Sequence, residues 1–189
     1  MKSKAAAYPS LSIAIIGDSY AAGELNRVVW PTLLAQRSGW SVSNFALPGA
    51  GFAADGRGGH AFTYQVDRAQ AAHPQIILIA TGQADNRLRD MEPVRLGAVD
   101  VLNKIELGGQ RALVMGPTWY ATPVPEKVQK VSEAVGQAAQ QAGVPFLGAI
   151  DPPWLTRKLM QTDLASPTDA GQSLIADRVL AWLHTVTGI

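Results

Sequence analysis

The chain has 189 residues, of which 47% are hydrophobic and 16% are charged, and its formal net charge is +1. This composition excludes a disordered chain, and the balanced charge, without a basic run, gives no indication of a nucleic-acid surface. The sequence contains no cysteine, which excludes disulfide bonds, thiolate metal sites and a cysteine nucleophile, and leaves the redox compartment open.

No apolar run reaches the roughly 20 residues that a membrane-spanning helix requires. We therefore expect a soluble domain, either cytoplasmic or extracytoplasmic. The basic start Met1-Lys2-Ser3-Lys4 is not followed by the apolar stretch of a signal peptide. We interpret residues 1–189 as one domain in which residues 1–10 form a flexible N-terminal extension. The soluble tail of a longer membrane acyltransferase would have the same appearance.

Five short apolar runs alternate with longer helical patterns along the chain. The predicted strands cover Ser12 to Ile16, Trp40 to Ala46, Gln75 to Ala80, Arg111 to Met115, and Val144 to Ile150. The predicted helices cover Val28 to Arg37, Ala61 to Ala72, Glu92 to Leu107, Pro125 to Ala142, and Thr168 to Thr185. This alternation predicts a three-layer α/β/α sandwich with about five parallel strands, because parallel neighbours need crossover helices. Functional residues are then expected just after the carboxyl ends of the strands.

The turn Gly17-Asp18-Ser19-Tyr20 follows the first predicted strand. A serine in a tight strand-to-helix turn exposes its hydroxyl at the edge of the sheet, where backbone N–H groups can stabilise an oxyanion. The competing interpretation is that Asp18 or Ser19 only caps a helix, because Ser and Asp are favoured N-cap residues. The tetrapeptide alone does not separate the two interpretations, since matches this short are common.

Three later segments strengthen the first interpretation. Asn44-Phe45-Ala46-Leu47-Pro48-Gly49 follows the second strand, Gly82-Gln83-Ala84-Asp85 follows the third, and Asp163-Leu164-Ala165-Ser166-Pro167 precedes the last helix. Together with Gly17-Asp18-Ser19, they resemble the G-D-S, N-x-x-x-x-G, G-x-N-D and D-x-x-H-P blocks of the SGNH (GDSL-type) hydrolase family, in the same order and at similar spacing. The resemblance extends from about Ile13 to the C-terminus and implies a flavodoxin-like strand order of 2-1-3-4-5.

The resemblance also implies roles for individual residues. Ser19, next to Asp18, matches the nucleophile, and its backbone N–H together with that of Gly49 would bind the oxyanion. Asp163 matches the acid that orients the catalytic histidine in the family. Neither a cofactor nor a metal is implied.

Two positions depart from the family pattern. The family's third oxyanion donor, an Asn side chain, falls on Ala84, and loss of one such donor costs about 10²–10³ in rate. The family's catalytic His falls on Ser166, and serine does not act as a general base near pH 7. Removing the base of a serine hydrolase costs on the order of 10⁶ in turnover. An engineered replacement at Ser166 is one explanation that the sequence leaves open.

Three residues are candidate substitutes for the missing groups. His60 lies on the same predicted edge as Ser19 and would accept its proton, although a solvated loop histidine is the alternative. Gln83 and Asn86 carry amides that would replace the lost donor, or they are ordinary polar loop residues. The other two histidines, His73 and His184, are expected at a distance from Ser19.

Substrate contacts are predicted from aromatic residues near the same edge. Tyr20, Trp119, Tyr120 and Trp154 would line an acyl or sugar pocket, although ordinary packing equally explains aromatic residues. Nucleotide binding is disfavoured, because the G-x-G-x-x-A match at Gly49 follows the second strand and no acidic residue ends the next one. No His-x-x-x-His or Glu-x-x-His spacing indicates a metal site.

The sequence leads to two functional hypotheses. The first is an esterase or acyltransferase with a serine nucleophile, acting on a small-molecule O-acyl ester of a carbohydrate or lipid, and very weak or inactive because Ser166 replaces the histidine. The second is a non-catalytic pseudo-hydrolase domain that binds an acylated ligand or a protein partner. Neither hypothesis involves nucleic acid. A membrane contact would require a further segment of a parent protein, and the oligomeric state is not indicated.

Overall fold

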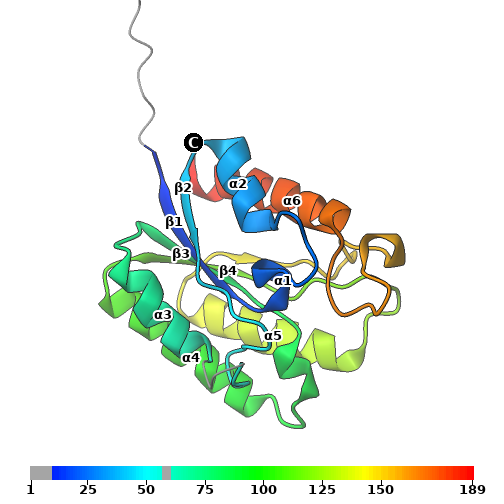
Figure 1. Ribbon diagram of the computed structural model, residues 1–189. Helices are drawn as coiled ribbons and strands as arrows, with labels where there is room; N and C mark the ends of the chain where they lie inside the picture. Colours follow the sequence, from blue (N-terminus) through cyan, green and yellow to red (C-terminus); the bar gives the residue numbers. More distant parts are fainter. Residues whose placement is uncertain (1–9, 57–60) are drawn as a thin grey trace, which may run out of the picture.

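The computed structural model describes residues 10–56 and 61–189, and it contains one parallel sheet with the strand order β2-β1-β3-β4-β5 (Figure 1). The strands are β1 (Ser12–Gly17), β2 (Ser41–Asn44), β3 (Ile76–Ala80), β4 (Arg111–Met115) and β5 (Phe146–Leu147). The parallel pairing and this strand order confirm both the predicted α/β class and the flavodoxin-like topology.

Helices cover both faces of the sheet. They are α1 (Ser19–Ala22), α2 (Trp30–Ser38), α3 (Phe62–Ala71), α4 (Glu92–Leu107), α5 (Glu126–Gln141) and α6 (Asp169–Thr187), with the 3-10 helices η1 (Ala84–Arg87) and η2 (Arg157–Leu159). Helices α2 and α6 lie side by side on one face, whereas α3, α4 and α5 cover the other (Figure 1). The three predicted layers are therefore present.

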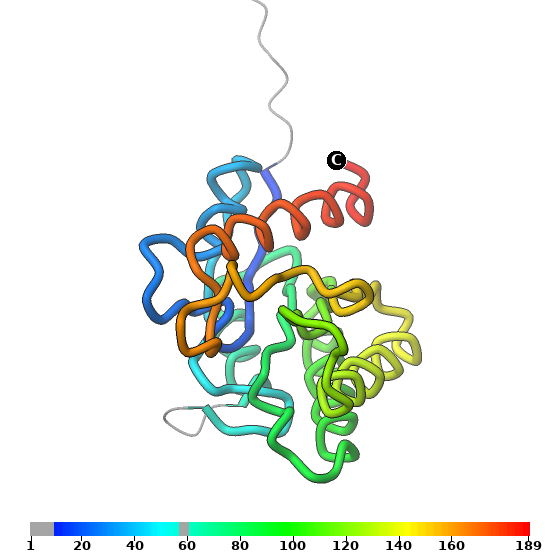
Figure 2. The backbone as a smooth tube through the Cα atoms, turned by 90° about the vertical axis from the view of Figure 1, so that its right-hand side faces the viewer, coloured from blue at the N-terminus to red at the C-terminus, as the bar shows by residue number. Residues whose placement is uncertain are grey.

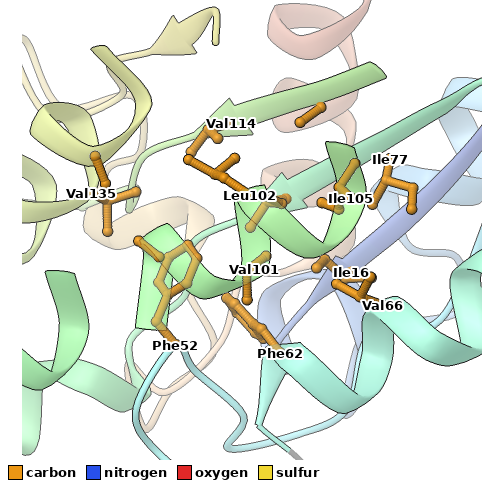
Figure 3. Packing of buried hydrophobic residues seen from close by; sticks show 14 of the residues in the cluster. Ile16, Phe52, Phe62, Val66, Ile77, Val101, Leu102, Ile105, Val114 and Val135 are labelled. Carbon is orange, nitrogen blue, oxygen red and sulfur yellow. The ribbon is translucent and has the colours of Figure 1, made fainter. Parts of the chain in front are cut away.

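The sheet divides the apolar core in two. In β1, Ala14 and Ile16 pack toward the α3–α5 layer, and Ile13 and Ile15 pack toward the α2–α6 layer. Figure 3 shows the first of these cores, in which Ile16 lies among residues from the strands and from α3 and α4. Because both faces are buried, an inner strand such as Ile76–Ala80 reads as a continuous apolar run instead of an alternating one.

The two edge strands are shorter than the sequence predicted. The sequence predicts a second strand from Trp40 to Ala46 and a fifth from Val144 to Ile150, but β2 has only four residues and β5 only two. Trp40, Ala46 and Val144 pack against the two cores without belonging to the ladder. Their apolar character therefore reflects packing beside the sheet, which a sequence pattern does not distinguish from strand pairing.

The start of β1 and the end of α6 lie at one end of the molecule, away from the carboxyl ends of the strands (Figures 1 and 2). Of the predicted N-terminal extension, residues 1–9 lie outside the described residues. Within residues 10–56 and 61–189, no helix is both long enough and apolar enough to cross a membrane.

Candidate active site

Ser19 is the first residue of α1 and comes directly after the turn that ends β1. Asp18 is the N-cap of this helix, and its Oδ1 accepts a hydrogen bond of 2.9 Å from the backbone N–H of Tyr20. The capping interpretation of Asp18 is therefore confirmed, and it is compatible with a separate role for Ser19. The cap fixes the direction in which α1 leaves the sheet.

The Asp18 carboxyl is enclosed by the turn after β3. Its second oxygen accepts a hydrogen bond of 2.8 Å from the backbone N–H of Gln83. A Cβ atom added to Gly82 would lie 1.8 Å from the Asp18 carboxyl carbon, so only glycine allows the two chains to approach this closely. Burial raises the pKa of Asp18 to about 6, and the N–H donors of Gln83 and Tyr20 oppose this shift while the charge of Asp85 adds to it.

A pocket of about 340 Å³ opens beside Ser19 at the carboxyl ends of the strands. Five of the predicted site residues line it: Ser19, Asp18, Tyr20, Gly49 and Gln83. The structure therefore brings the first two sequence blocks together with the third.

The same pocket is also lined by Ala84, the position that the resemblance assigns to the third oxyanion donor. Its remaining walls come from η1 and from the segments after α1, β2, η1 and η2: Arg87, Glu24, Ala54, Asp55, Leu88 and Ala165. A larger cavity of about 580 Å³, lined by Pro123, Glu133 and Asp151 among others, contains none of the predicted residues. Pocket volume alone would therefore place the functional site away from Ser19, whereas the polar residues that line the smaller pocket favour a site at Ser19.

The loop that carries Gly49 is fixed by Asp85. This carboxylate is 2% exposed and accepts hydrogen bonds from the backbone N–H groups of Phe52 (2.8 Å), Ala53 (3.2 Å) and Ala54 (2.9 Å). Burial raises the pKa of Asp85, and the three donors act in the opposite direction. Gly49 adopts a φ of 76°, a left-handed conformation in which a side chain would be strained.

The position that the family resemblance assigns to the third oxyanion donor carries a methyl group in the pocket wall. Ala84 begins η1 and lines the pocket beside Ser19. The Gln83 amide donates to the carbonyl oxygen of Thr118 at 2.8 Å, and the Asn86 amide donates to the side-chain oxygen of Gln83. Gln83 remains at the pocket surface, whereas Asn86 is not part of the lining.

The segment before α6 presents Ala165, not Ser166, at the pocket. Ser166 is only 2% exposed, and its carbonyl oxygen accepts a hydrogen bond of 2.8 Å from the Gln161 backbone N–H. Asp163 is exposed, and its Oδ1 accepts from the Ala165 backbone N–H at 3.0 Å. The carboxylate expected to orient a histidine thus stabilises a local turn of its own segment.

The three histidines do not supply a base in the described part of the pocket. His60 lies outside the described residues. His73 precedes β3, at the opposite edge of the sheet, with a φ of 50°. His184 lies near the end of α6, where its ring packs edge-on against Trp40 at 5.3 Å between ring centroids.

The predicted aromatic contacts separate into two groups. Tyr20 lines the pocket and is 7% exposed, and burial raises its pKa. Trp119 and Tyr120 stack on each other with their centroids 4.5 Å apart, and Trp154 packs against the α2–α6 core. These last three residues do not line the 340 Å³ pocket. In residues 10–56 and 61–189, no three His, Asp or Glu side chains are grouped as metal ligands.

A serine at the start of a helix, following an inner strand of a five-stranded parallel sheet and facing a small pocket, defines an esterase-type hydrolase domain of the SGNH class. The model of the GDSL-like lipase/acylhydrolase family matches residues 15–184, and the chain belongs to this family.

Comparison with individual proteins agrees with this membership. A GDSL lipase from Mycobacterium tuberculosis is 27% identical over 183 residues, which cover 88% of this chain and 79% of the lipase. A Lactobacillus plantarum protein superposes with a TM-score of 0.76 at 16% identity, covering 95% of this chain and 99% of that one. A psychrotrophic esterase, EstA from Pseudoalteromonas, solved with monoethylphosphonate as inhibitor, gives 0.70 at 17% identity, with coverage of 94% and 98%. The two superpositions show that the fold is shared.

Proposed function

We propose that this domain cleaves an O-acyl ester of a carbohydrate or lipid through Ser19, and that its turnover is very weak because no imidazole stands at position 166. The observation that carries the proposal is the meeting of Ser19 and Gly49 in one pocket at the carboxyl ends of the strands. The name of the Mycobacterium tuberculosis relative, a GDSL lipase, and the inhibited esterase from Pseudoalteromonas support an ester substrate.

In the proposed reaction, the Ser19 oxygen attacks the ester carbonyl carbon, and the backbone N–H groups of Ser19 and Gly49 hold the negative oxygen that forms. The alcohol leaves with a proton, which gives an acyl-serine, and water then releases the acid. Transfer of the acyl group to a second alcohol would follow the same course. The pocket volume of about 340 Å³ supports a short acyl group, because it lies at the small end of ligand sites.

Deprotonation of Ser19 is the slow step of this proposal. Asp18 is the nearest carboxyl in sequence, but both of its oxygens already accept backbone hydrogen bonds. Glu24 and Asp55 also line the pocket, and a carboxylate is a weaker base than an imidazole near neutral pH. His60, which follows Asp55 by five residues, stays the proposed substitute base.

The second candidate is a binding domain without turnover. Ala84 in the pocket wall and the buried Ser166 support it, because the family's Asn and His at these two positions are groups that only catalysis needs. The engagement of the Gln83 and Asn86 amides elsewhere supports it further. This candidate retains the pocket as the place where an acylated ligand binds.

One experiment separates the two candidates. Hydrolysis of p-nitrophenyl acetate and labelling by a fluorophosphonate are measured for the starting protein and for Ser19→Ala, with His60→Ala as a third sample. Turnover and labelling that vanish in Ser19→Ala support the esterase, and a loss of turnover in His60→Ala relative to the starting protein identifies the base. Labelling that is absent from pH 6 to pH 9 in a folded starting protein would reject the esterase and leave the binding domain.

A further inference from the structure

Trp119 packs differently from the other tryptophans of the chain. The other four contribute to the α2–α6 core or pack against it: Trp30, Trp40, Trp154 and Trp182. Trp119 is half-buried and belongs to neither core cluster, although its neighbour Tyr120 does pack on the α2–α6 side. Within the described ranges, the ring contact of Trp119 is the stack with Tyr120, at 4.5 Å between centroids and 25° between planes. The Trp119 ring is thus only partly covered by the two cores.

The neighbour of this ring has a second contact of its own. The guanidinium of Arg157 lies over the Tyr120 ring, 5.7 Å from its centroid, so Tyr120 contacts both Trp119 and Arg157. The backbone on either side is also held, since Gln83 donates to the Thr118 carbonyl at 2.8 Å and Leu155 donates to the Trp119 carbonyl at 3.0 Å. A ring held in this way loses little conformational entropy when a ligand stacks on it.

The Trp119–Tyr120 stack lies at the carboxyl ends of the strands, as Ser19 does. Trp119 follows β4, which pairs with β3, and β3 in turn pairs with β1, whose end carries the Asp18-Ser19 turn. Gln83 connects the two places directly, because it lines the Ser19 pocket and holds the residue before Trp119. A pocket of about 340 Å³ has room for the acyl group but not for a glycan as well. The alcohol part of a glycan ester would then lie outside the pocket, at the carboxyl ends of the strands, where Trp119 also lies.

We propose that Trp119, backed by Tyr120 and Arg157, is a stacking subsite for a pyranose ring of a carbohydrate. The C–H face of a pyranose is apolar and flat enough to lie on an indole, while its hydroxyl groups stay in water. That the sugar is the alcohol part of an ester rests on the function proposed above. Binding of the sugar to Trp119 does not depend on catalysis.

The test is a binding titration of the whole chain with cellohexaose, xylohexaose and chitohexaose, followed by tryptophan fluorescence and calorimetry. At least one of the three is expected to bind saturably and to change the emission of Trp119. Trp119→Ala is expected to weaken binding about tenfold or more, whereas Trp119→Phe retains part of the affinity. Trp182→Phe is the matched control, because this partly buried tryptophan of α6 packs on the core, and its affinity should equal that of the starting protein.

Each result of the titration decides the proposal. Failure of all three sugars to bind, or equal affinity in folded Trp119→Ala, would overturn it. Esterase activity measured on the starting protein and on Ser19→Ala separates the two proposals: sugar binding by a starting protein that shows no Ser19-dependent hydrolysis leaves the subsite standing and removes the esterase. Esterase activity on p-nitrophenyl acetate without sugar binding does the reverse.

Discussion

The side-chain amide of Gln65 forms two hydrogen bonds with the backbone of Gly17, the last residue of β1. The Gly17 N–H donates to the amide oxygen at 2.8 Å, and the amide nitrogen donates to the Gly17 carbonyl at 2.9 Å. Gln65 is fully buried and comes from α3, so a helix side chain acts here as a short piece of neighbouring strand. It holds the backbone immediately before Asp18 and Ser19.

We expect Gln65→Leu to lower the free energy of unfolding by about 2–4 kcal/mol, because it leaves the buried Gly17 N–H without a partner and removes two hydrogen bonds. Urea denaturation measures this change. Gln129→Leu is the control, since the exposed Gln129 side chain makes a single bond of 2.7 Å to the Val124 carbonyl and its loss should cost less than about 1 kcal/mol. Equal costs for the two variants would contradict the role given to Gln65.

Gly82→Ala should disturb the nucleophile turn from the other side. The added methyl carbon would lie 1.9 Å from Asp18 Oδ2, so the β3 turn and the Asp18 cap must move apart. We expect a loss of about 3 kcal/mol or more in the free energy of unfolding, from overpacking together with a weakened Asp18–Gln83 bond.

Gly148→Ala provides the comparison for this variant, because a Cβ atom there meets nothing within 4 Å. Its stability should change by less than about 1 kcal/mol. Thermal unfolding of both proteins checks the difference. Similar melting temperatures of the two variants would mean that a methyl group at position 82 fits beside Asp18 without strain.

The buried Asp18 carboxyl should make stability depend on pH in an unusual direction. Its pKa is about 6 in the folded protein and 3.8 as the ordinary value, so the folded state binds more protons between these pH values. The contribution of Asp18 to folding is therefore most favourable at low pH and falls as pH rises toward 6, by about 3 kcal/mol in total.

Asp18→Ser isolates this contribution, because serine retains an N-cap oxygen but does not titrate in this range. The difference in unfolding free energy between the starting protein and Asp18→Ser should shift by about 2–3 kcal/mol in favour of the starting protein between pH 7 and pH 4. Urea titrations at the two pH values measure it. A difference that stays constant, or shifts the other way, would show that the folded pKa of Asp18 is not raised.

The sheet could be predicted from the sequence because its inner strands are buried on both faces. Ile76–Ala80 is apolar at every position, and its short length between two helical segments favours a buried strand over a buried helix. The edges were less predictable, since Phe45 and Ala46 pack against the cores after β2 has already ended. At the edges of the sheet, apolar residues that pack beside a strand are of the same types as those that pair within it, so the sequence does not show where the strand ends.

The site could be predicted where its residues directly follow a strand. It was less predictable where it depends on side-chain contacts between segments distant in the sequence. Ser19 and Gly49 follow strands, and parallel topology brings them together. Gln65 is separated from Gly17 by 48 positions in the sequence, and nothing in the sequence pattern of α3 distinguishes it from the other polar residues of the helix. Asp85 had a visible signal, as the acid at the end of the third block, but its three backbone partners follow only from the folded loop.

Placing the family's His at position 166 and its Asn at position 84 is expected to raise the esterase activity of the domain. We expect Ser166→His to raise kcat/KM for p-nitrophenyl acetate by about 10² or more, because it returns a base near neutral pH. Ala84→Asn alone should change little, since a donor to the oxyanion helps only once Ser19 is deprotonated. In the Ser166→His background it should add a further factor of about 10–10².

The environment of position 166 sets the main condition for this result. Ser166 is almost fully buried, so the imidazole must displace Ala165 or neighbouring atoms to reach Ser19, and the melting temperature of each variant has to be measured alongside the rate. Adding Ser19→Ala to the double variant should abolish the gain. A folded, stable double variant without activity would mean that the 163–167 segment does not direct position 166 toward Ser19.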